Sequence, residues 1–211
     1  GGARAAEGNM TQRERAARGL LYDPVTDPEL IAERARCKAL CHEYNHLHPD
    51  LLEERAALIR RILGHVAGAF WIEPPFWCDY GYNVSIGDNF YANHGCVILD
   101  GGRVTFGDNV FLAPYCGFYT AGHPLDAAQR AEGLEYAYPI TVGNNVWLGA
   151  QVAVLPGVTI GDDAVIGAGS VVNRDIPSGV VAAGNPCRVL RKITGEDVMD
   201  AERPWAAMGN K

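Results

Sequence analysis

Several features that mark other classes of protein are missing from this sequence. No apolar run approaches the roughly 20 residues that a membrane-spanning helix needs. The six cysteines form no CxxC pair and no zinc-ribbon spacing, so we expect reduced thiols packed as small hydrophobic side chains. The net charge of −7 argues against nucleic acid as the main partner, because phosphate backbones bind to basic surfaces. These absences favour a cytoplasmic protein with neither a membrane nor a nucleic acid as its partner.

The first third of the chain carries a helical pattern. Residues 1–9 lack a signal-peptide pattern and an initiator Met, and we interpret them as a leader or a cloning remnant. Residues 10–66 are predicted to form a helical segment, in which Thr11 caps a first helix and Asp27 begins a second. A third helix is expected to begin with a capping pair, Asp50 and Glu53. Its predicted buried stripe consists of Leu52, Ala56, Ile59 and Leu63.

From about Tyr80 onward the sequence repeats with a period of six residues, which is its most informative feature. In the second half, aliphatic residues recur without a slip at Val142, Leu148, Val154, Ile160, Ile166 and Val172. The first half repeats less regularly at Tyr80, Ile86, Ala92 and Ile98, and after a two-residue insertion at Phe106, Leu112 and Phe118. Gly or Asn stands beside many of these positions, as tight corners require.

A six-residue period fits neither an α-helix nor ordinary strands. It predicts short strands on the three faces of a prism, with three hexapeptides to a turn and the aliphatic residues inside. We predict this solenoid over residues 67–193, followed by a tail over residues 194–211. Between Phe118 and Val142 the period lapses. A lapse of this length in a solenoid is typical of a functional loop, here at about residues 119–141.

Stretches along nearly the whole chain resemble those of the maltose and galactoside O-acetyltransferases. The matching stretches are YNHLHP, DYGYNVSIGDNFYAN, the GHP of the loop, GLEYAYPITVGNNVWLGA, VLPGVTIGDDAVIGAGSVV and AAGNPCRVLRKI. The resemblance implies a mainly β fold, a left-handed parallel β-helix of hexapeptide repeats with an N-terminal helical segment. It also implies an enzyme that moves an acetyl group from acetyl-CoA to a hydroxyl of a sugar or similar small acceptor. The family forms homotrimers with sites between subunits, and the same is expected here.

His123, in the GHP of the loop, is the predicted general base. An alcohol is a poor nucleophile, and imidazole is the side chain that accepts a proton near neutral pH. The alternative interpretation is a surface histidine bonded to a loop carbonyl. By resemblance, Asn93 helps to orient the acceptor hydroxyl and the histidine; otherwise it is an asparagine tolerated at a corner.

Four further residues are predicted to contact the acceptor. Asp79 occupies a place where sugar acetyltransferases carry a polar acceptor-binding residue, although a capping carboxylate is an equal alternative there. Asp23 is a weaker candidate from the helical segment. Glu135 stands where the galactoside enzyme carries methionine, which leaves the acceptor open among glucosides, galactosides, maltose, other alcohols and amines. Tyr91 lines the same pocket or packs between coils.

The co-substrate acetyl-CoA is expected to lie along one face of the solenoid. Ala150 and Ala168 are eighteen residues apart, so they stack in adjacent turns and leave a groove for the pantetheine arm. By resemblance, the Ala150 amide also supports the thioester oxyanion. Trp147 points outward beside this groove, with a trimer contact as its alternative role. The predicted contacts to the CoA phosphates are Arg174, Arg188 and Arg191, with a solvated charged surface as the alternative.

Two competing functions have less support. A γ-type carbonic anhydrase on such a solenoid needs three histidines around zinc, and the repeat region contains only His94 and His123. A non-enzymatic scaffold would leave His123, its loop and the basic residues near the end unexplained. Whether His94 lines the pocket is left open. Cys41, His42, His46 and His48 cluster at a predicted helix end. They belong to a stretch shared with the family, and no metal is expected there.

Overall fold

The computed structural model describes residues 9–209, so residues 1–8 of the predicted leader lie outside the described part of the chain. Three helices precede the solenoid: α2 (Gln12–Ala17), α3 (Pro28–His46) and α4 (Leu52–Ile62). Thr11 caps α2 in a capping box with Glu14. The Asp27 carboxylate accepts a hydrogen bond from the Leu30 amide at 2.9 Å at the start of α3. The predicted starts of the first two helices are confirmed.

The start and the buried face of α4 differ from their predictions. Its N-cap is Leu51, and no side chain caps the helix there, so the predicted pair of Asp50 and Glu53 is wrong. Ile59 and Leu63 are buried as predicted, but Leu52 is 50% exposed, and Arg55, Leu58 and Ile62 are buried as well. The stripe is displaced because Arg55 lies inside it: its guanidinium donates to the Ile72 carbonyl at 3.1 Å. A charged residue was not expected in the core, and this bond is what permits it.

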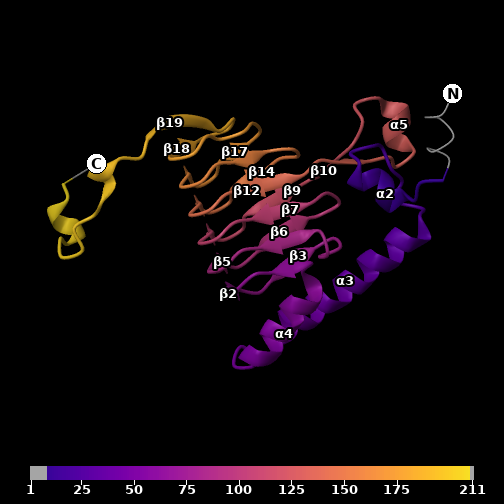
Figure 1. Ribbon diagram of the computed structural model, residues 1–211, viewed down its shortest axis with the longest axis horizontal. Helices are drawn as coiled ribbons and strands as arrows, with labels where there is room; N and C mark the ends of the chain where they lie inside the picture. Colours follow the sequence, from indigo (N-terminus) through magenta and orange to yellow (C-terminus); the bar gives the residue numbers. More distant parts are fainter. Residues whose placement is uncertain (1–8, 210–211) are drawn as a thin grey trace.

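Three parallel sheets form the faces of the solenoid (Figure 1). The first face contains β1 (His65–Val66), β4 (Val84–Ile86), β7 (Val104–Phe106), β12 (Ile140–Val142) and β15 (Thr159–Ile160). The second face contains β2 (Phe70–Ile72), β5 (Phe90–Ala92), β8 (Phe111–Leu112), β13 (Trp147–Leu148), β16 (Val165–Ile166) and β18 (Val180–Ala183). The third face contains β3 (Phe76–Cys78), β6 (Cys96–Leu99), β9 (Gly117–Tyr119), β14 (Ala153–Val154) and β17 (Val171–Val172). Finally, β19 (Arg188–Lys192) pairs antiparallel with β18.

The residues of the six-residue period line the interior of this solenoid. Those of the second half are each at most 1% exposed: Val142, Leu148, Val154, Ile160, Ile166 and Val172. In the first half the rings of Phe90, Phe106 and Phe118 follow one another inside, with centroids 5.1 and 4.9 Å apart. The predicted fold class is confirmed as a mainly β, parallel solenoid with an N-terminal helical segment.

Asparagine side chains build the corner between the first and second faces. Asn89, Asn109 and Asn145 have φ angles of 54°, 55° and 59°, a left-handed conformation that asparagine tolerates better than most residues. Their side-chain amides donate along the stack, Asn89 to Asn109 and Asn109 to Asn145, each at 2.9 Å. Asn145 continues the series to Asp163 at 2.8 Å. This ladder fixes the register of successive turns.

The solenoid is interrupted by one loop and followed by an arm. After β9 the chain forms β10 (Ala121–Gly122), the short helix α5 (Ala127–Ala131) and β11 (Tyr136–Ala137), which pairs antiparallel with β10. This loop projects beside α2, whereas the residues after β19 leave on the other side of the molecule as an arm (Figure 1). The arm contains two 3₁₀ turns, Gly195–Asp197 and Trp205–Ala207. Within residues 9–209, no helix has the length and apolar character needed to cross a bilayer.

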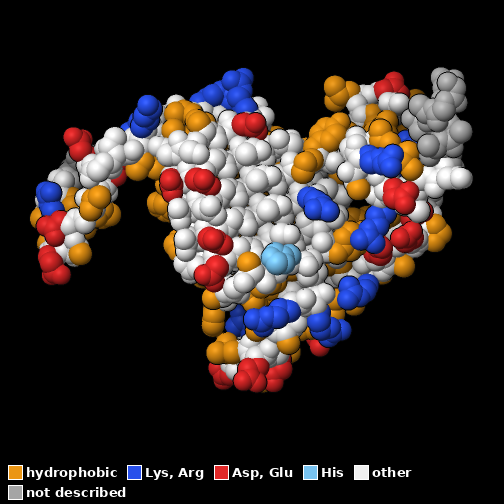
Figure 2. All heavy atoms as spheres, viewed as in Figure 1, with side chains coloured by type: hydrophobic (Ala, Val, Ile, Leu, Met, Phe, Trp, Pro, Cys, Tyr) orange, Lys and Arg blue, Asp and Glu red, His pale blue; other side chains and the backbone are white. Residues whose placement is uncertain are grey.

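The outer surfaces of the three faces differ in chemistry. The first face presents a hydroxyl row in register: Ser85, Thr105, Thr141 and Thr159. The second presents Trp71, Tyr91, Phe111, Trp147 and Val165, and the third presents Trp77, Val97, Gly117, Ala153 and Val171. Figure 2 shows a solenoid face with few hydrophobic side chains at its centre. A hydroxyl row suits water, whereas the two apolar rows suit a ligand or another protein surface.

Candidate active site

His123 follows β10 at the base of the loop, and its side chain is 51% exposed. Its Nδ1 atom lies 3.1 Å from the carbonyl oxygen of Leu134, on the returning side of the loop. A carbonyl oxygen only accepts hydrogen bonds, so Nδ1 carries the proton and Nε2 keeps its lone pair. The loop therefore holds the histidine in the tautomer that a general base needs.

Glu135 lies next to this histidine and is anchored by Tyr22. The Glu135 Oε1 atom is 3.9 Å from His123 Nε2. The backbones of Tyr22 and Glu135 exchange hydrogen bonds of 2.9 and 3.0 Å, and the Tyr22 hydroxyl donates to Glu135 Oε2 at 3.1 Å. Burial, together with the charge of Glu135, raises the pKa of Tyr22, so its hydroxyl stays a donor. The sequence analysis missed Tyr22, because nothing in its local pattern indicates a partner more than a hundred residues away.

Asp79 follows β3 and is half-buried. Burial raises the pKa of Asp79, the charge of Glu135 raises it further, and Arg34 and Lys38 oppose the effect. The repulsion between Asp79 and Glu135 indicates that these two predicted acceptor residues share one region of the molecule.

Asp100, where the six-residue period is interrupted, stabilises the turn that contains Asp79. It is fully buried and accepts hydrogen bonds from the amides of Tyr80, at 2.8 Å, and Asn83, at 3.3 Å. Burial raises the pKa of Asp100 to about 6. Its two bonds fix the turn that begins with Asp79, a supporting role that the sequence analysis did not assign.

Asp23 is adjacent to Tyr22, but its carboxylate is used in a local turn. It accepts hydrogen bonds from the amides of Val25, at 2.9 Å, and Thr26, at 3.0 Å, and also from the Thr26 hydroxyl. These bonds, the Thr26 hydroxyl first, lower the pKa of Asp23. Within the chain Asp23 therefore holds the turn before α3, and its contact to an acceptor stays a prediction.

Asn93 and Tyr91 lie on the second face. Tyr91 points outward from β5, and Asn93 follows the strand. The Asn93 side-chain oxygen accepts a hydrogen bond from the His94 amide at 2.7 Å. The His94 ring is held by its own chain, with Nδ1 against the Pro74 carbonyl and Nε2 3.9 Å from Glu73. Asn93 is thus oriented on this face, whereas His94 is occupied by neighbours from the preceding turn.

Outward aromatic side chains of the second face line an apolar groove of about 690 Å³. Trp71, Tyr91, Phe111 and Trp147 stand in register on consecutive turns along it. Trp147 is 54% exposed and Phe111 is 44% exposed. A row of aromatic rings left in water is unfavourable, which makes this groove a surface for a ligand or a neighbouring subunit.

Ala150 and Ala168 stack in adjacent turns at the corner between the second and third faces. The Gly169 amide donates to the Ala150 carbonyl at 2.8 Å. A Cβ on Gly149 would lie 2.6 Å from the Ala168 nitrogen, so no larger residue fits between these turns. The small residues keep this corner narrow and its backbone accessible beside Trp147.

The three arginines predicted to bind phosphates have different partners. Arg174 is exposed, and no hydrogen bond or ion pair joins its side chain to the rest of residues 9–209. Arg188 donates to the Asn173 side chain at 3.2 Å. Arg191 forms a bidentate pair with Asp197, at 2.9 and 2.7 Å. Arg191 therefore already has an anionic partner within the chain, which the sequence analysis did not anticipate.

The predicted catalytic, acceptor and pantetheine residues fall into two groups. The loop group lies at or beside the corner between the third and first faces and consists of His123, Glu135, Asp79 and Asp23. The groove group lies on the second face and its corner with the third and consists of Tyr91, Asn93, Trp147, Ala150 and Ala168. Across the described part of the chain, no hydrogen bond or ion pair joins one group to the other. One chain does not bring the predicted catalytic pair, His123 and Asn93, together.

Comparisons with known proteins agree with this architecture. Two family models match, the maltose acetyltransferase hexapeptide capping motif over residues 15–68 and the bacterial transferase hexapeptide (six repeats) over residues 139–174. The galactoside O-acetyltransferase of Escherichia coli is 48% identical over 189 residues, covering 90% of this chain and 93% of the relative. A solved galactoside acetyltransferase in complex with coenzyme A superposes with a TM-score of 0.86 at 48% identity, covering 90% and 94% of the two chains. A solved maltose O-acetyltransferase from Clostridium difficile superposes with a TM-score of 0.85 at 46% identity, covering 88% of this chain and 98% of the other.

The hexapeptide solenoid with a histidine-bearing loop defines the class, that of the hexapeptide-repeat acyltransferases. Within this class, the chain belongs to the maltose and galactoside O-acetyltransferase family. The predicted family and the predicted type of enzyme, an O-acetyltransferase, are confirmed.

Proposed function

We propose that the enzyme transfers an acetyl group from acetyl-CoA to a hydroxyl of a sugar, at sites formed between the subunits of a homotrimer. The observation that carries this proposal is the bond from His123 Nδ1 to the Leu134 carbonyl, which leaves Nε2 free to accept a proton. The six cysteines are free and buried, which suits the reducing cytoplasm in which we place the enzyme.

In the proposed reaction, the acceptor oxygen attacks the thioester carbon directly while His123 Nε2 takes the hydroxyl proton. The carbon–sulfur bond then breaks, and the sulfur leaves as the thiol of CoA with the proton returned by the imidazolium. Glu135, 3.9 Å from Nε2, stabilises the imidazolium during this exchange. No acyl-enzyme is needed, so a side-chain nucleophile is not part of the proposal.

Acetyl-CoA is proposed to lie along the groove group. The narrow corner at Ala150 and Ala168 accepts the pantetheine arm, and Trp147 covers its side. The Ala150 amide would support the oxyanion that forms on the thioester. Arg188 and Arg174 are better candidates than Arg191 for binding the CoA phosphates, because Arg191 is already paired with Asp197.

The proposed trimer follows from the separation of the two groups. The base and its partners lie at one corner, whereas Asn93 and Tyr91 lie on another face of the same prism. A neighbouring copy related by threefold symmetry can present its groove group to this loop group. The apolar outer rows of the second and third faces supply surfaces for such contacts.

The acceptor is proposed to be a neutral sugar, because its side of the site is acidic. The carboxylates of Asp79 and Glu135 accept hydrogen bonds from hydroxyl groups and repel anions. Glucosides, maltose and galactosides all meet this description.

Acceptor profiling tests the proposed function directly. The purified enzyme is given acetyl-CoA with a panel of glucosides, galactosides, maltose, an aliphatic alcohol, a sugar phosphate and an amino sugar, and thiol release is followed. We expect release with neutral sugars and little with the sugar phosphate. Thiol release that no neutral sugar accelerates would overturn the proposed acceptor class.

A further inference from the structure

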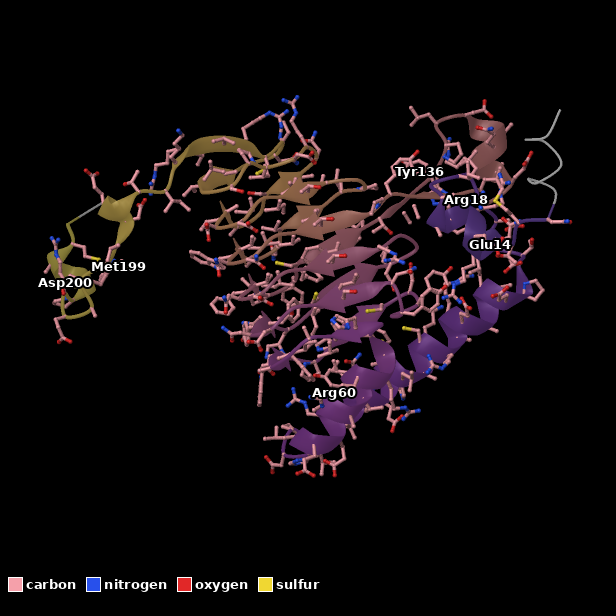
Figure 3. The ribbon with its side chains drawn as sticks, in the orientation of Figure 1. Glu14, Arg18, Arg60, Tyr136, Met199 and Asp200 are labelled. Carbon is pink, nitrogen blue, oxygen red and sulfur yellow. The ribbon has the colours of Figure 1, made fainter. Side chains whose placement is uncertain are left out.

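A second cavity, of about 430 Å³, lies between α2 and the solenoid, and its lining includes none of the residues predicted to act in catalysis or to bind the acceptor or acetyl-CoA. Its volume falls in the range of roughly 300–1,000 Å³ typical of small-molecule sites. Helix α2 forms one wall, and the chain at Gly101, Gly102 and Arg103 forms another. Figure 3 shows Arg18 of α2 and Tyr136 of the loop base at the same end of the molecule.

The cavity is basic, although the chain as a whole is acidic. Its lining contains Arg13, Arg18 and Arg103 and no carboxylate. Arg13 is fixed by Glu33, at 3.3 Å, and by stacking on the Tyr82 ring. Arg18 and Arg103 are exposed, and within residues 9–209 neither guanidinium group forms an ion pair. Two uncompensated guanidinium groups at one cavity attract an anion.

The rest of the lining suits an organic body attached to that anion. The rings of Tyr22, Tyr80 and Tyr82 form aromatic surface, and their hydroxyls are already bonded, to Glu135, Arg34 and Glu33. Tyr22 and Tyr80 are almost fully buried, and Arg13 covers a face of Tyr82, so these tyrosines offer an apolar wall rather than open ring faces. Such a wall packs against the carbon skeleton of a sugar. A small phosphorylated or carboxylated metabolite combines both requirements.

We infer that this cavity is a binding site for a small organic anion of the sugar-phosphate type, separate from the acceptor site. Tyr22 connects the two sites, because its ring lines the cavity while its hydroxyl holds Glu135 opposite His123. A ligand packed against Tyr22 restrains the residue that positions the catalytic loop. The inference concerns binding and does not require the transferase reaction to proceed as proposed.

Calorimetric titration of the intact enzyme with glucose 6-phosphate, inorganic phosphate and glucose tests this site. We expect the sugar phosphate to bind more tightly than inorganic phosphate, because only the sugar phosphate uses the tyrosine rings. The double variant Arg18→Ala/Arg103→Ala should weaken it about tenfold or more, because two charge-assisted contacts are lost. The control Arg61→Ala removes an exposed arginine from α4 and should leave binding unchanged.

A second variant fills the cavity without changing its charge. Ala17→Leu adds bulk from α2, and Ala57→Leu is the matched control at an exposed position of α4. Ala17→Leu should abolish sugar-phosphate binding while the control retains it. Hydrogen exchange should show protection of α2 and of residues 101–103 on binding. Absence of binding, or binding lost only in Arg188→Ala/Arg191→Ala, would overturn the inference, the second result by placing the anion at β19.

Discussion

The loop group and the groove group are organised in opposite ways. Three members of the loop group have hydrogen-bond partners within their own chain: His123 with Leu134, Glu135 with Tyr22, and Asp23 with Thr26. The groove group instead presents a row of exposed aromatic rings and a corner of small residues with open surface beside them.

In the proposed trimer, this difference indicates which half of the site a single chain supplies. A base must be held in one tautomer and one position, and the antiparallel pairing of β10 with β11 does this locally. A groove needs only a shape and an apolar surface, so its opposite wall can come from another molecule. The following experiments perturb one half and ask whether the other responds.

Loss of the base should give the largest effect. His123→Ala should lower kcat by about two to four orders of magnitude, because proton transfer from the acceptor hydroxyl loses its general base. The KM for acetyl-CoA should stay nearly constant, since the groove is untouched. Steady-state kinetics measure both, with His42→Ala on α3 as the control. A variant that keeps more than about a tenth of wild-type kcat would remove His123 from its assigned role.

The phosphate contacts should affect only the donor substrate. Arg188→Ala should raise the KM for acetyl-CoA about tenfold or more and leave the acceptor KM unchanged. Arg191→Ala should have a smaller effect, because Asp197 already occupies that guanidinium and the side chain is exposed. Initial rates over a matrix of both substrates separate the two KM values. An increase confined to the acceptor KM would contradict the proposed orientation of CoA.

Glu135 sharpens the comparison from the loop side. Glu135→Gln should lower kcat about tenfold, because a carboxylate 3.9 Å from Nε2 no longer stabilises the imidazolium. Tyr22→Phe keeps that carboxylate but removes its anchoring hydroxyl, so a decrease of about threefold is expected. An unchanged kcat in Glu135→Gln, with thermal stability intact, would contradict a role of Glu135 in stabilising the imidazolium and would leave it only a contact to the acceptor.

Asp100 should affect stability rather than catalysis. Its ordinary pKa is 3.8 and burial raises it to about 6, so between these values the folded chain binds the proton more readily than the unfolded chain. Ionisation of Asp100 therefore lowers stability as pH rises from about 4 to 7, by about 3 kcal/mol in total. In Asp100→Asn this contribution disappears, and the wild-type advantage over the variant should shrink by that amount across the window. Denaturant unfolding at several pH values measures it, and a constant difference would contradict the account.

Much of the fold could be predicted because the register of the solenoid appears directly as a six-residue period in the sequence. Val142, Leu148 and their successors are buried at every sixth position, and no long-range information is needed to see that spacing. The helix starts at Thr11 and Asp27 could also be predicted, because an N-cap contact joins residues only three positions apart. The buried face of α4 could not be predicted, since it includes Arg55, whose guanidinium donates to the Ile72 carbonyl on β2.

The parts of the site that escaped prediction depend on distant pairs. Tyr22 hydrogen-bonds to Glu135, which lies more than a hundred residues later in the sequence. Asp100 lies where the six-residue period is interrupted, so the period does not predict its burial or its partners. The pairing of Arg191 with Asp197 is different, because Thr194 and Asp197 form a local capping box that the sequence displays. A local sequence signal therefore exists for the position of Asp197.

The central claim is that the active site is completed by a neighbouring subunit, and mixed trimers test it most directly. His123→Ala and Asn93→Ala subunits, each nearly inactive alone, are refolded together in equal amounts, and light scattering confirms the trimer. With shared sites, about a quarter of the sites combine an intact His123 with an intact Asn93 from the next subunit. Activity should therefore recover to about a quarter of wild type. Activity no greater than the average of the two parent variants would show that each chain builds its site alone.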